Sequence, residues 1–168
     1  MTEPWSGRDL GSDFGRRQIR LSVVVPAYNE SKTIRALVDR VRAVPLQIEL
    51  VVVDDGSTDG TSDILLELEQ RKLIDRLILH VQNRGKGSAL RAGFREATGD
   101  VVVVQDADLE YDPMELPGLI EPIVRGWADA VYGSRFLGGL HRVHLFWHSV
   151  GNRVVTLASN ILTDLNLT

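Results

Sequence analysis

The chain has 168 residues, of which 43% are hydrophobic, so it is long enough to form one domain with its own core. Its formal net charge of −4 argues against general binding of nucleic acid. The absence of cysteine excludes disulfides and thiolate metal sites, which fits a reducing compartment such as the cytoplasm.

The two ends of the chain differ in character. Residues 1–20 are rich in Gly, Ser and charge and lack the apolar core of a signal peptide, so they predict a mobile tail. The longest uncharged run near the other end, "VVTLASNILT", is far shorter than the roughly 20 apolar residues of a membrane-spanning helix. No closing element follows this run, and we expect the sequence to be a piece of a longer protein.

Short, β-branched apolar segments alternate with amphipathic segments along the chain. Helices are expected to begin near Ser31, after Gly60, in the glycine-rich segment before Lys86 and near Pro113. The alternation predicts an α/β fold whose ligands bind at the carboxyl ends of the strands. The expected buried, mostly parallel strands are "LSVVVP" from Leu21, "IELVVVD" from Ile48, "RLILHV" from Arg76, "DVVVVQ" from Asp100 and "DAVYG" from Asp129.

The first loop after a strand reads "PAYNE". It lacks the glycines of a dinucleotide-binding or nucleotidyltransferase phosphate loop. Pro26 fixes a turn, and Tyr28 and Glu30 could offer a ring face and a carboxylate to a nucleobase. An ordinary strand-to-helix turn capped by Asn29 or Ser31 explains the same residues equally well.

The second loop, "DDGSTDGT", is similar to the start of a calcium loop. Leu66 stands at the position of the final glutamate ligand, so a calcium site is excluded. Helix capping by Thr58 or Asp59 and a tight turn at Gly56 account for most of the loop, but not for two adjacent acids at the end of a strand. Asp55 could accept a hydrogen bond from an N–H group of a base.

The third loop, "NRGKGSALRAG", is not a Walker loop. His80 stands where that motif needs its first glycine, and Gly87 stands where it needs Ser or Thr. A glycine-rich helix start can nevertheless bind an anion. A phosphate contact and a purely structural role therefore fit Lys86 equally well.

The fourth loop, in "VVVVQDADLEYDP", carries Asp106, Asp108 and Glu110. In extended backbone, side chains two residues apart point the same way and lie roughly 6.6 Å apart. Three converging carboxylates with no His or Cys nearby predict a Mg²⁺ or Mn²⁺ site that substrate phosphates complete. Capping acids on a solvated loop would explain Asp112 and also Glu110, but not Asp106 and Asp108 directly behind four valines.

Basic residues follow the fifth segment. Arg135 in "YGSRF" could clamp a phosphate, although a surface ion pair is the simpler alternative. His141, His144 and His148 lack a nearby acidic partner and an HExxH pattern, which disfavours a zinc site.

The motifs "VVVPAYNE", "VVVDDGSTDGT", "QDADLEYDP" and "YGSRF", in this order, resemble those of family 2 glycosyltransferases with a GT-A fold. The resemblance is strongest to the dolichyl-phosphate mannose synthase group of polyprenyl-phosphate glycosyltransferases and covers about residues 21–168. It implies a GT-A nucleotide-sugar-binding core over residues 21–140, with a mostly parallel sheet flanked by helices. Residues 141–168 would form an incomplete acceptor-side segment that lies at the lipid boundary.

The resemblance also implies roles for single residues. Asp106, Ala107 and Asp108 would form the DxD motif, whose two carboxylates bind Mg²⁺ or Mn²⁺. Arg135 would bind the diphosphate or its sugar. Glu110 stands where many synthases of this group have Gln or Ser, so a third metal carboxylate would be a departure from the pattern. The residues implied to line the nucleotide pocket are Pro26, Tyr28, Glu30, Val53, Asp55, Asp106, Ala107 and Asp108.

The implied activity is metal-dependent, inverting transfer of a sugar from GDP-mannose or a UDP-sugar to a polyprenyl or dolichyl phosphate. Asp106, Asp108 and Arg135 would be catalytic because they stabilise charge on the departing diphosphate. A phosphate acceptor is already ionised near neutral pH and needs no general base. The protein would be cytoplasmic and peripheral at the membrane surface, where "HLFWHSVGNRVV" suits the lipid boundary.

Two other functions are consistent with the sequence. The first is a glycosyltransferase of the same fold that acts on a sugar or protein hydroxyl. The second is a non-catalytic fragment that binds nucleotide sugars. A receiver domain is disfavoured, because its acid pair follows the first strand, whereas the pair in this chain follows the second.

Overall fold

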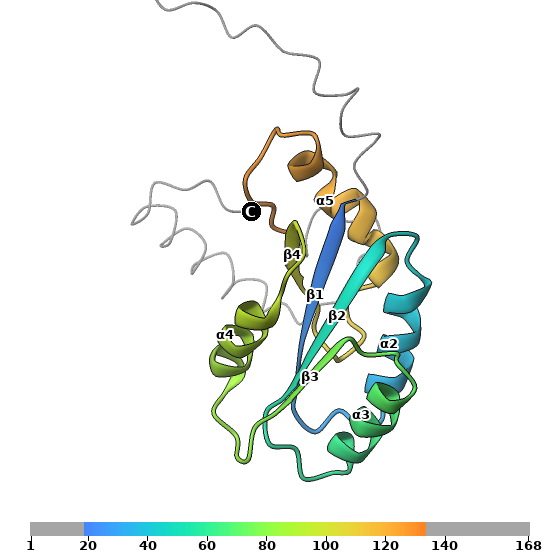
Figure 1. Ribbon diagram of the computed structural model, residues 1–168, viewed down its shortest axis with the longest axis vertical. Coiled ribbons are helices and arrows are strands. Elements are labelled where there is room, and N and C mark those ends of the chain that lie inside the picture. The colour runs from blue at the N-terminus through green and yellow to red at the C-terminus, as the bar shows by residue number, and fades with distance from the viewer. Residues whose placement is uncertain (1–18, 134–168) are drawn as a thin grey trace, which may run out of the picture. The chain divides into compact units, whose positions relative to one another are not determined.

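Strands and helices alternate through the part of the chain that the computed structural model describes, residues 19–133. The strands form one parallel sheet in the order β3-β2-β1-β4 (Figure 1), which confirms the expected α/β fold. The elements are β1 (Arg20–Ala27), α2 (Ile34–Ala43), β2 (Gln47–Asp54), α3 (Thr61–Gln70), β3 (Arg76–Leu79), α4 (Lys86–Glu96), β4 (Val101–Val104), the 3-10 helix η1 (Pro113–Glu115) and α5 (Leu116–Val124).

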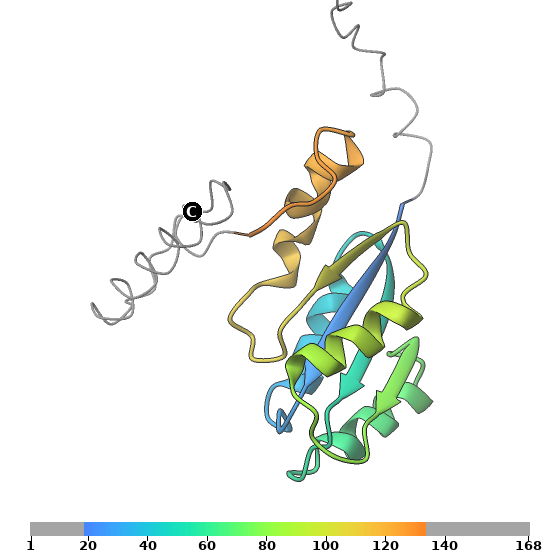
Figure 2. The ribbon, with the colours of Figure 1, turned by 90° about the vertical axis from the view of Figure 1, so that its left-hand side faces the viewer.

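Helices cover both faces of the sheet. Figure 2 shows α4 in front of the sheet, with α2 and α3 behind it. The main hydrophobic core lies between the sheet and the helices α2, α3 and α5. On the other face α4 approaches β1 very closely, because a Cβ added to Gly93 would lie 2.4 Å from Cγ1 of Val24. A glycine at this point therefore sets the spacing between helix and sheet.

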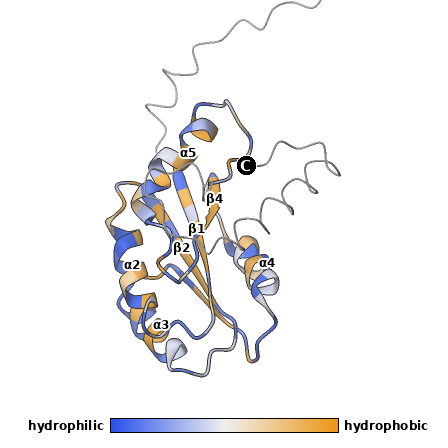
Figure 3. Cartoon of the chain, turned by 180° about the vertical axis from the view of Figure 1, so that it is seen from behind, coloured by the Kyte–Doolittle hydropathy of each residue, from blue (hydrophilic) through white to orange (hydrophobic). Residues whose placement is uncertain are grey.

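The two central strands are the most buried. Val23, Val24 and Val25 of β1 are fully buried, as is the run Leu50 to Val53 of β2. In Figure 3 the hydrophobic colour follows the strands, while hydrophilic colour marks much of the helices. The alternation of buried and polar positions on α2, for example, places Leu37 and Val41 in the core.

The expectation of buried outer strands is wrong for β3 and β4, since neither strand has a fully buried residue. Val102 and Val104 are 43% and 39% exposed. They lie opposite Ser22 and Val24 in the register and so share the sheet face on which α4 packs against β1 and β2. A run of valines shows that a strand is favoured, but its burial depends on which helix lies over it.

The strand expected from Asp129 is not present in the described part of the chain, where residues 129–133 form no strand. Among residues 19–133, β4 pairs with β1 alone. A strand is defined by hydrogen bonds to a neighbouring backbone, and a β-branched sequence cannot supply that neighbour.

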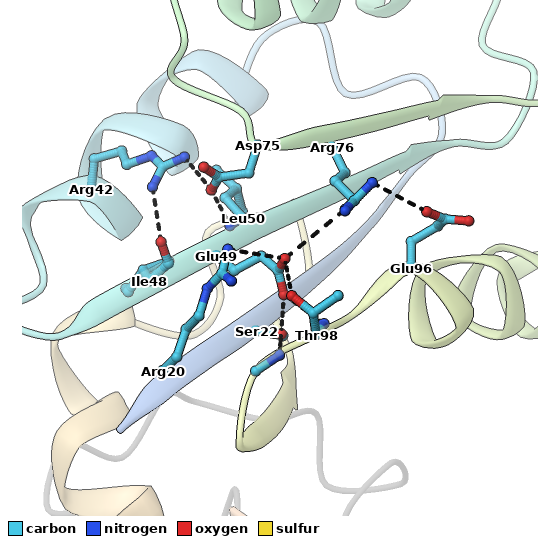
Figure 4. A network of polar contacts seen from close by, with 11 residues as sticks. Arg20, Ser22, Arg42, Ile48, Glu49, Leu50, Asp75, Arg76, Glu96 and Thr98 are labelled. Atoms are coloured by element: carbon cyan, nitrogen blue, oxygen red, sulfur yellow. Dashed lines mark hydrogen bonds and ion pairs between the residues drawn. The ribbon is translucent and has the colours of Figure 1, made fainter. Parts of the chain in front are cut away.

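A buried carboxylate joins the amino-terminal halves of the strands. Glu49 is 1% exposed, and its oxygens accept hydrogen bonds from Oγ of Ser22 at 2.5 Å and from the backbone N–H of Thr98 at 2.7 Å (Figure 4). Arg20 adds an ion pair at 3.2 Å. Burial alone would raise the pKa of Glu49, but these hydrogen bonds outweigh it and lower the pKa to about 2. The charged carboxylate therefore ties β1, β2 and the α4–β4 turn together.

None of the helices in the described region has the length and apolar character to cross a lipid bilayer.

Candidate functional site

The loops that follow the four strands of the described region meet at a pocket with a volume of about 260 Å³. Three of these loops, after β1, β2 and β3, lie at the lower end of the sheet in Figure 1. The volume is close to the lower limit of roughly 300 Å³ for small-molecule pockets. The lining residues are Pro26, Ala27, Tyr28, Glu30, Asp55, Asn83, Lys86, Ala89, Asp106, Ala107 and Asp108.

The β1–α2 and β2–α3 loops are joined by side-chain to backbone hydrogen bonds. Asn29 does not cap α2, which begins at Ile34; it adopts a left-handed φ of 57° and bonds to the neighbouring loop. Asparagine tolerates this conformation better than most residues. Tyr28 and Glu30, on either side of it, are thereby held at the pocket, and Tyr28 is 47% exposed. The bonds are Thr58 N to Asn29 Oδ1 at 2.8 Å, Asn29 N to Ser57 Oγ at 2.9 Å, Glu30 N to Thr61 Oγ1 at 2.9 Å and Ser31 N to Asp59 Oδ2 at 3.1 Å.

Asp55 lies directly after β2, is 3% exposed, and organises the loop between β3 and α4. Its carboxylate accepts hydrogen bonds from the backbone N–H of Arg84 at 3.0 Å and of Gly85 at 2.7 Å. Nδ1 of His80 lies 2.7 Å from the same carboxylate. Burial acts to raise the pKa of Asp55, but the hydrogen bonds from His80 and the two N–H groups outweigh it, so the pKa is lowered. Within the chain, the contacts of Asp55 anchor the β3–α4 loop. A contact between Asp55 and a nucleobase stays a prediction.

The same β3–α4 loop packs closely against the turn after β2. Gly56 has φ of 74°, and a Cβ at this position would lie 2.6 Å from the backbone nitrogen of Asn83. Only glycine fits this approach without displacement of the loop. The turn thus fixes the loop that brings Asn83 and Lys86 to the pocket.

The acids after β4 lie on a turn and not on extended backbone. The strand ends at Val104, Leu109 has φ of 62°, and Oδ1 of Asp108 accepts a hydrogen bond from the backbone N–H of Glu110 at 2.9 Å. This local bond competes with extension, so the acids do not have the extended geometry from which their convergence was expected. Among residues 19–133, no three His, Cys, Asp or Glu side chains gather to form a metal cluster. Asp106 and Asp108 nevertheless both line the pocket, and Glu110 does not.

Asp106 forms an ion pair with Lys86 in the pocket. The Nζ atom of Lys86 lies 2.6 Å from Oδ1 of Asp106, and the two side chains are 58% and 21% exposed. Within the described region this buried oxygen receives no well-aligned hydrogen bond, so the contact is an ion pair only. A buried carboxylate oxygen that lacks a directed donor suits a hard divalent cation such as Mg²⁺ or Mn²⁺. Asp106, with Asp108 on the same loop, therefore fits the metal expected from the sequence.

The remaining predicted residues are placed differently. Pro26 and Ala107 line the pocket. Val53 does not, because it is fully buried in β2 and its side chain lies against Gly93 of α4. Arg135 and the three histidines of the later segment, His141, His144 and His148, lie outside the described residues.

Sequence reasoning missed several residues of the site. Asn83, Ala27 and Ala89 line the pocket, and His80 contacts Asp55 from β3's carboxyl end. His80 and Asn83 follow β3 at the same sheet edge as the other loops. Their position after a parallel strand could therefore have identified them as candidate site residues. Ala27 and Ala89 carry no chemical signal.

A parallel α/β sheet with a pocket at the carboxyl ends of its strands is typical of nucleotide-binding domains. The family model for glycosyl transferase family 2 matches residues 22–166. The chain therefore belongs to glycosyl transferase family 2, as its motifs predicted.

Some curated relatives have the names of transferases that act on polyprenyl phosphates. An undecaprenyl-phosphate 4-deoxy-4-formamido-L-arabinose transferase of Pectobacterium carotovorum is 41% identical over 113 residues, 64% of this chain and 34% of the relative. A dolichol-phosphate mannosyltransferase of Pyrococcus furiosus is 40% identical over 123 residues, 72% of this chain and 34% of the relative. The chain thus spans about a third of the length of these relatives.

Solved structures of glycosyltransferases share the fold. The mannosyltransferase PcManGT from Pyrobaculum calidifontis, in complex with GDP-Man and Mn²⁺, has a TM-score of 0.51 and 36% identity over 55% of this chain and 28% of its own. Glucosyl-3-phosphoglycerate synthase from Mycobacterium tuberculosis, with Mn²⁺, UDP and glucosyl-3-phosphoglycerate, has a TM-score of 0.54 and 30% identity over 73% of this chain and 46% of its own. The expected GT-A fold is confirmed.

Proposed function

We propose that this domain binds the nucleotide-diphosphate sugar donor of a glycosyltransferase whose acceptor is a polyprenyl phosphate. The observation that carries the proposal is the pocket at the carboxyl edge of the sheet, where Asp106 pairs with Lys86 and Asp108 lines the same pocket. Carboxylates for a cation and an ammonium group for phosphate are the two charges that a metal-bound diphosphate requires. The names of the relatives support the class of acceptor.

The donor would lie across the pocket with its base towards the β1–α2 loop. Tyr28 offers a half-exposed ring for stacking, and Glu30 and Asp55 line the same pocket with carboxylates that would accept hydrogen bonds from the base. Asp106 and Asp108 would hold Mg²⁺ or Mn²⁺, which stabilises negative charge on the departing diphosphate when bound. Lys86 would contribute positive charge to the same phosphates.

The acceptor side of the proposal rests on chemistry and on the later segment. A phosphate monoester is largely dianionic near neutral pH, since its second pKa is about 6, so it can attack the sugar without a general base. Attack from the side opposite the leaving diphosphate would invert the anomeric carbon. Arg135 would bind the diphosphate or its sugar. Residues 141–168 would form the acceptor side and lie at the cytoplasmic face of the membrane.

Isothermal titration of the purified chain with GDP and with UDP, each with and without Mn²⁺, tests the donor site. We expect one nucleotide to bind in a metal-dependent manner and Asp108→Ala to abolish that dependence. Asp39→Ala, the same substitution on an exposed position of α2 outside the pocket, is the matched control and should bind as the wild type does. Failure of both nucleotides to bind the wild-type chain would contradict the proposal.

A further inference from the structure

The ion pair between Lys86 and Asp106 connects the binding of the metal ion with the binding of the nucleotide. We infer that the ammonium group of Lys86 occupies the place that a metal ion would take at Asp106. A nucleotide diphosphate draws Lys86 away and so makes Asp106 available to Mg²⁺ or Mn²⁺. This inference rests on the proposed donor site. It makes Lys86 a positioning residue that couples the affinity for metal to the affinity for nucleotide.

The geometry makes the ammonium and the metal ion competitors. Nζ of Lys86 lies 2.6 Å from the buried Oδ1 of Asp106. A Mg²⁺ ion ligated by that oxygen would lie at about 2.0–2.1 Å from it. Two cations cannot occupy this space together, because their repulsion in a partly buried pocket is strong. Metal binding to Asp106 therefore requires Lys86 to leave.

Lys86 can leave without rearrangement of the backbone. Its side chain is 58% exposed, and it is the first residue of α4, directly after Gly85. The backbone N–H of Gly85 is fixed by its 2.7 Å hydrogen bond to Asp55. Only the flexible four-carbon stem of the lysine has to rotate.

A diphosphate gives the displaced ammonium a better partner. Phosphate oxygens carry more charge than one carboxylate, and the amino end of α4 adds the partial positive charge of the helix. Once Lys86 contacts the phosphates, Asp106 regains an unneutralised carboxylate beside them. Metal and nucleotide should then each strengthen the binding of the other by the same factor.

Mn²⁺ binding measured by electron paramagnetic resonance tests the inference without any measurement of activity. The purified chain is titrated with Mn²⁺ alone and with Mn²⁺ in the presence of saturating GDP or UDP, as wild type and as Lys86→Met. We expect Lys86→Met to bind Mn²⁺ alone about two- to fivefold more tightly, the size expected for loss of a partly exposed ion pair. The nucleotide should bind Lys86→Met less tightly without metal and should strengthen Mn²⁺ binding less than it does in the wild type.

Two further variants sharpen the comparison. Lys86→Arg keeps a cation at the site and should retain the wild-type pattern. Lys72→Met removes the same charge beyond the carboxyl end of α3, outside the pocket, and should leave Mn²⁺ binding unchanged. Circular dichroism checks that each variant is folded.

The outcomes separate the inference from the proposed function. If a nucleotide binds the wild type but Lys86→Met binds Mn²⁺ alone with unchanged or lower affinity, the inference is overturned and the donor site stands. If neither nucleotide binds the wild type, the donor site is refuted and the inference falls with it.

Discussion

Replacement of Glu49 by glutamine should remove an acid-sensitive part of the stability of this domain. The pKa of Glu49 is about 2 in the folded chain, against an ordinary value of 4.5. This difference corresponds to about 3 kcal/mol of folding free energy at neutral pH. Because the folded-state pKa is the lower one, this contribution is complete above pH 4.5 and is lost as the pH falls towards 2. Less than half of it should remain at pH 3.

Urea unfolding followed by far-ultraviolet circular dichroism, at several pH values between 7 and 3, measures this effect. Glu49→Gln keeps the shape of the side chain but cannot carry the charge that Ser22 and Thr98 stabilise. We expect the stability gap between wild type and variant to narrow by about 2 kcal/mol from pH 7 to pH 3. Other carboxylates with lowered pKa values titrate in both proteins and cancel in the comparison.

A matched control separates the effect of removing one negative charge from the effect of breaking the buried hydrogen bonds around Glu49. Glu69→Gln removes the same charge from an exposed position of α3 and should show a pH-independent gap close to zero. A gap between wild type and Glu49→Gln that stays constant over this pH range would refute the account of Glu49.

Three further predictions concern the packing that positions the site. Gly93→Val should destabilise the domain by about 1–3 kcal/mol in urea unfolding, because the added atoms overlap β1, whereas Gly118→Ala, with open space around it, should not. Gly56→Ala should weaken nucleotide binding in calorimetry more than Gly60→Ala does, since both have positive φ but only the first displaces the β3–α4 loop. Asp55→Asn should accelerate hydrogen exchange at residues 84–85, because the loop loses its charged acceptor; unchanged exchange would count against this anchor role.

The central elements could be predicted from the sequence because their signals are local. The apolar runs of β1 and β2 and the helix after Gly60 have the periodicity and turn residues of the elements they form. The outer strands could not be judged in the same way. Exposure of Val102 and Val104, and the absence of a strand at residues 129–133, depend on which segments lie beside and above them.

The site was predictable as a location more than as a geometry. The rule that ligands bind at the carboxyl edge placed Tyr28 and Asp106 at the pocket. The turn at Asp108 escaped prediction because a single side-chain to backbone bond overrides extended backbone. The contact between Lys86 and Asp106 joins residues from different loops, and no local pattern indicates such a pair.

The hydrogen bonds between the β1–α2 and β2–α3 loops have a consequence for how this site can change over time. Asn29 accepts from one loop with its side chain and donates to the same loop with its backbone, so neither loop keeps its shape without the other. An insertion in one of them would break bonds in both. We therefore expect the two loops to be inherited as one unit, with lengths and polar residues that vary together among homologues.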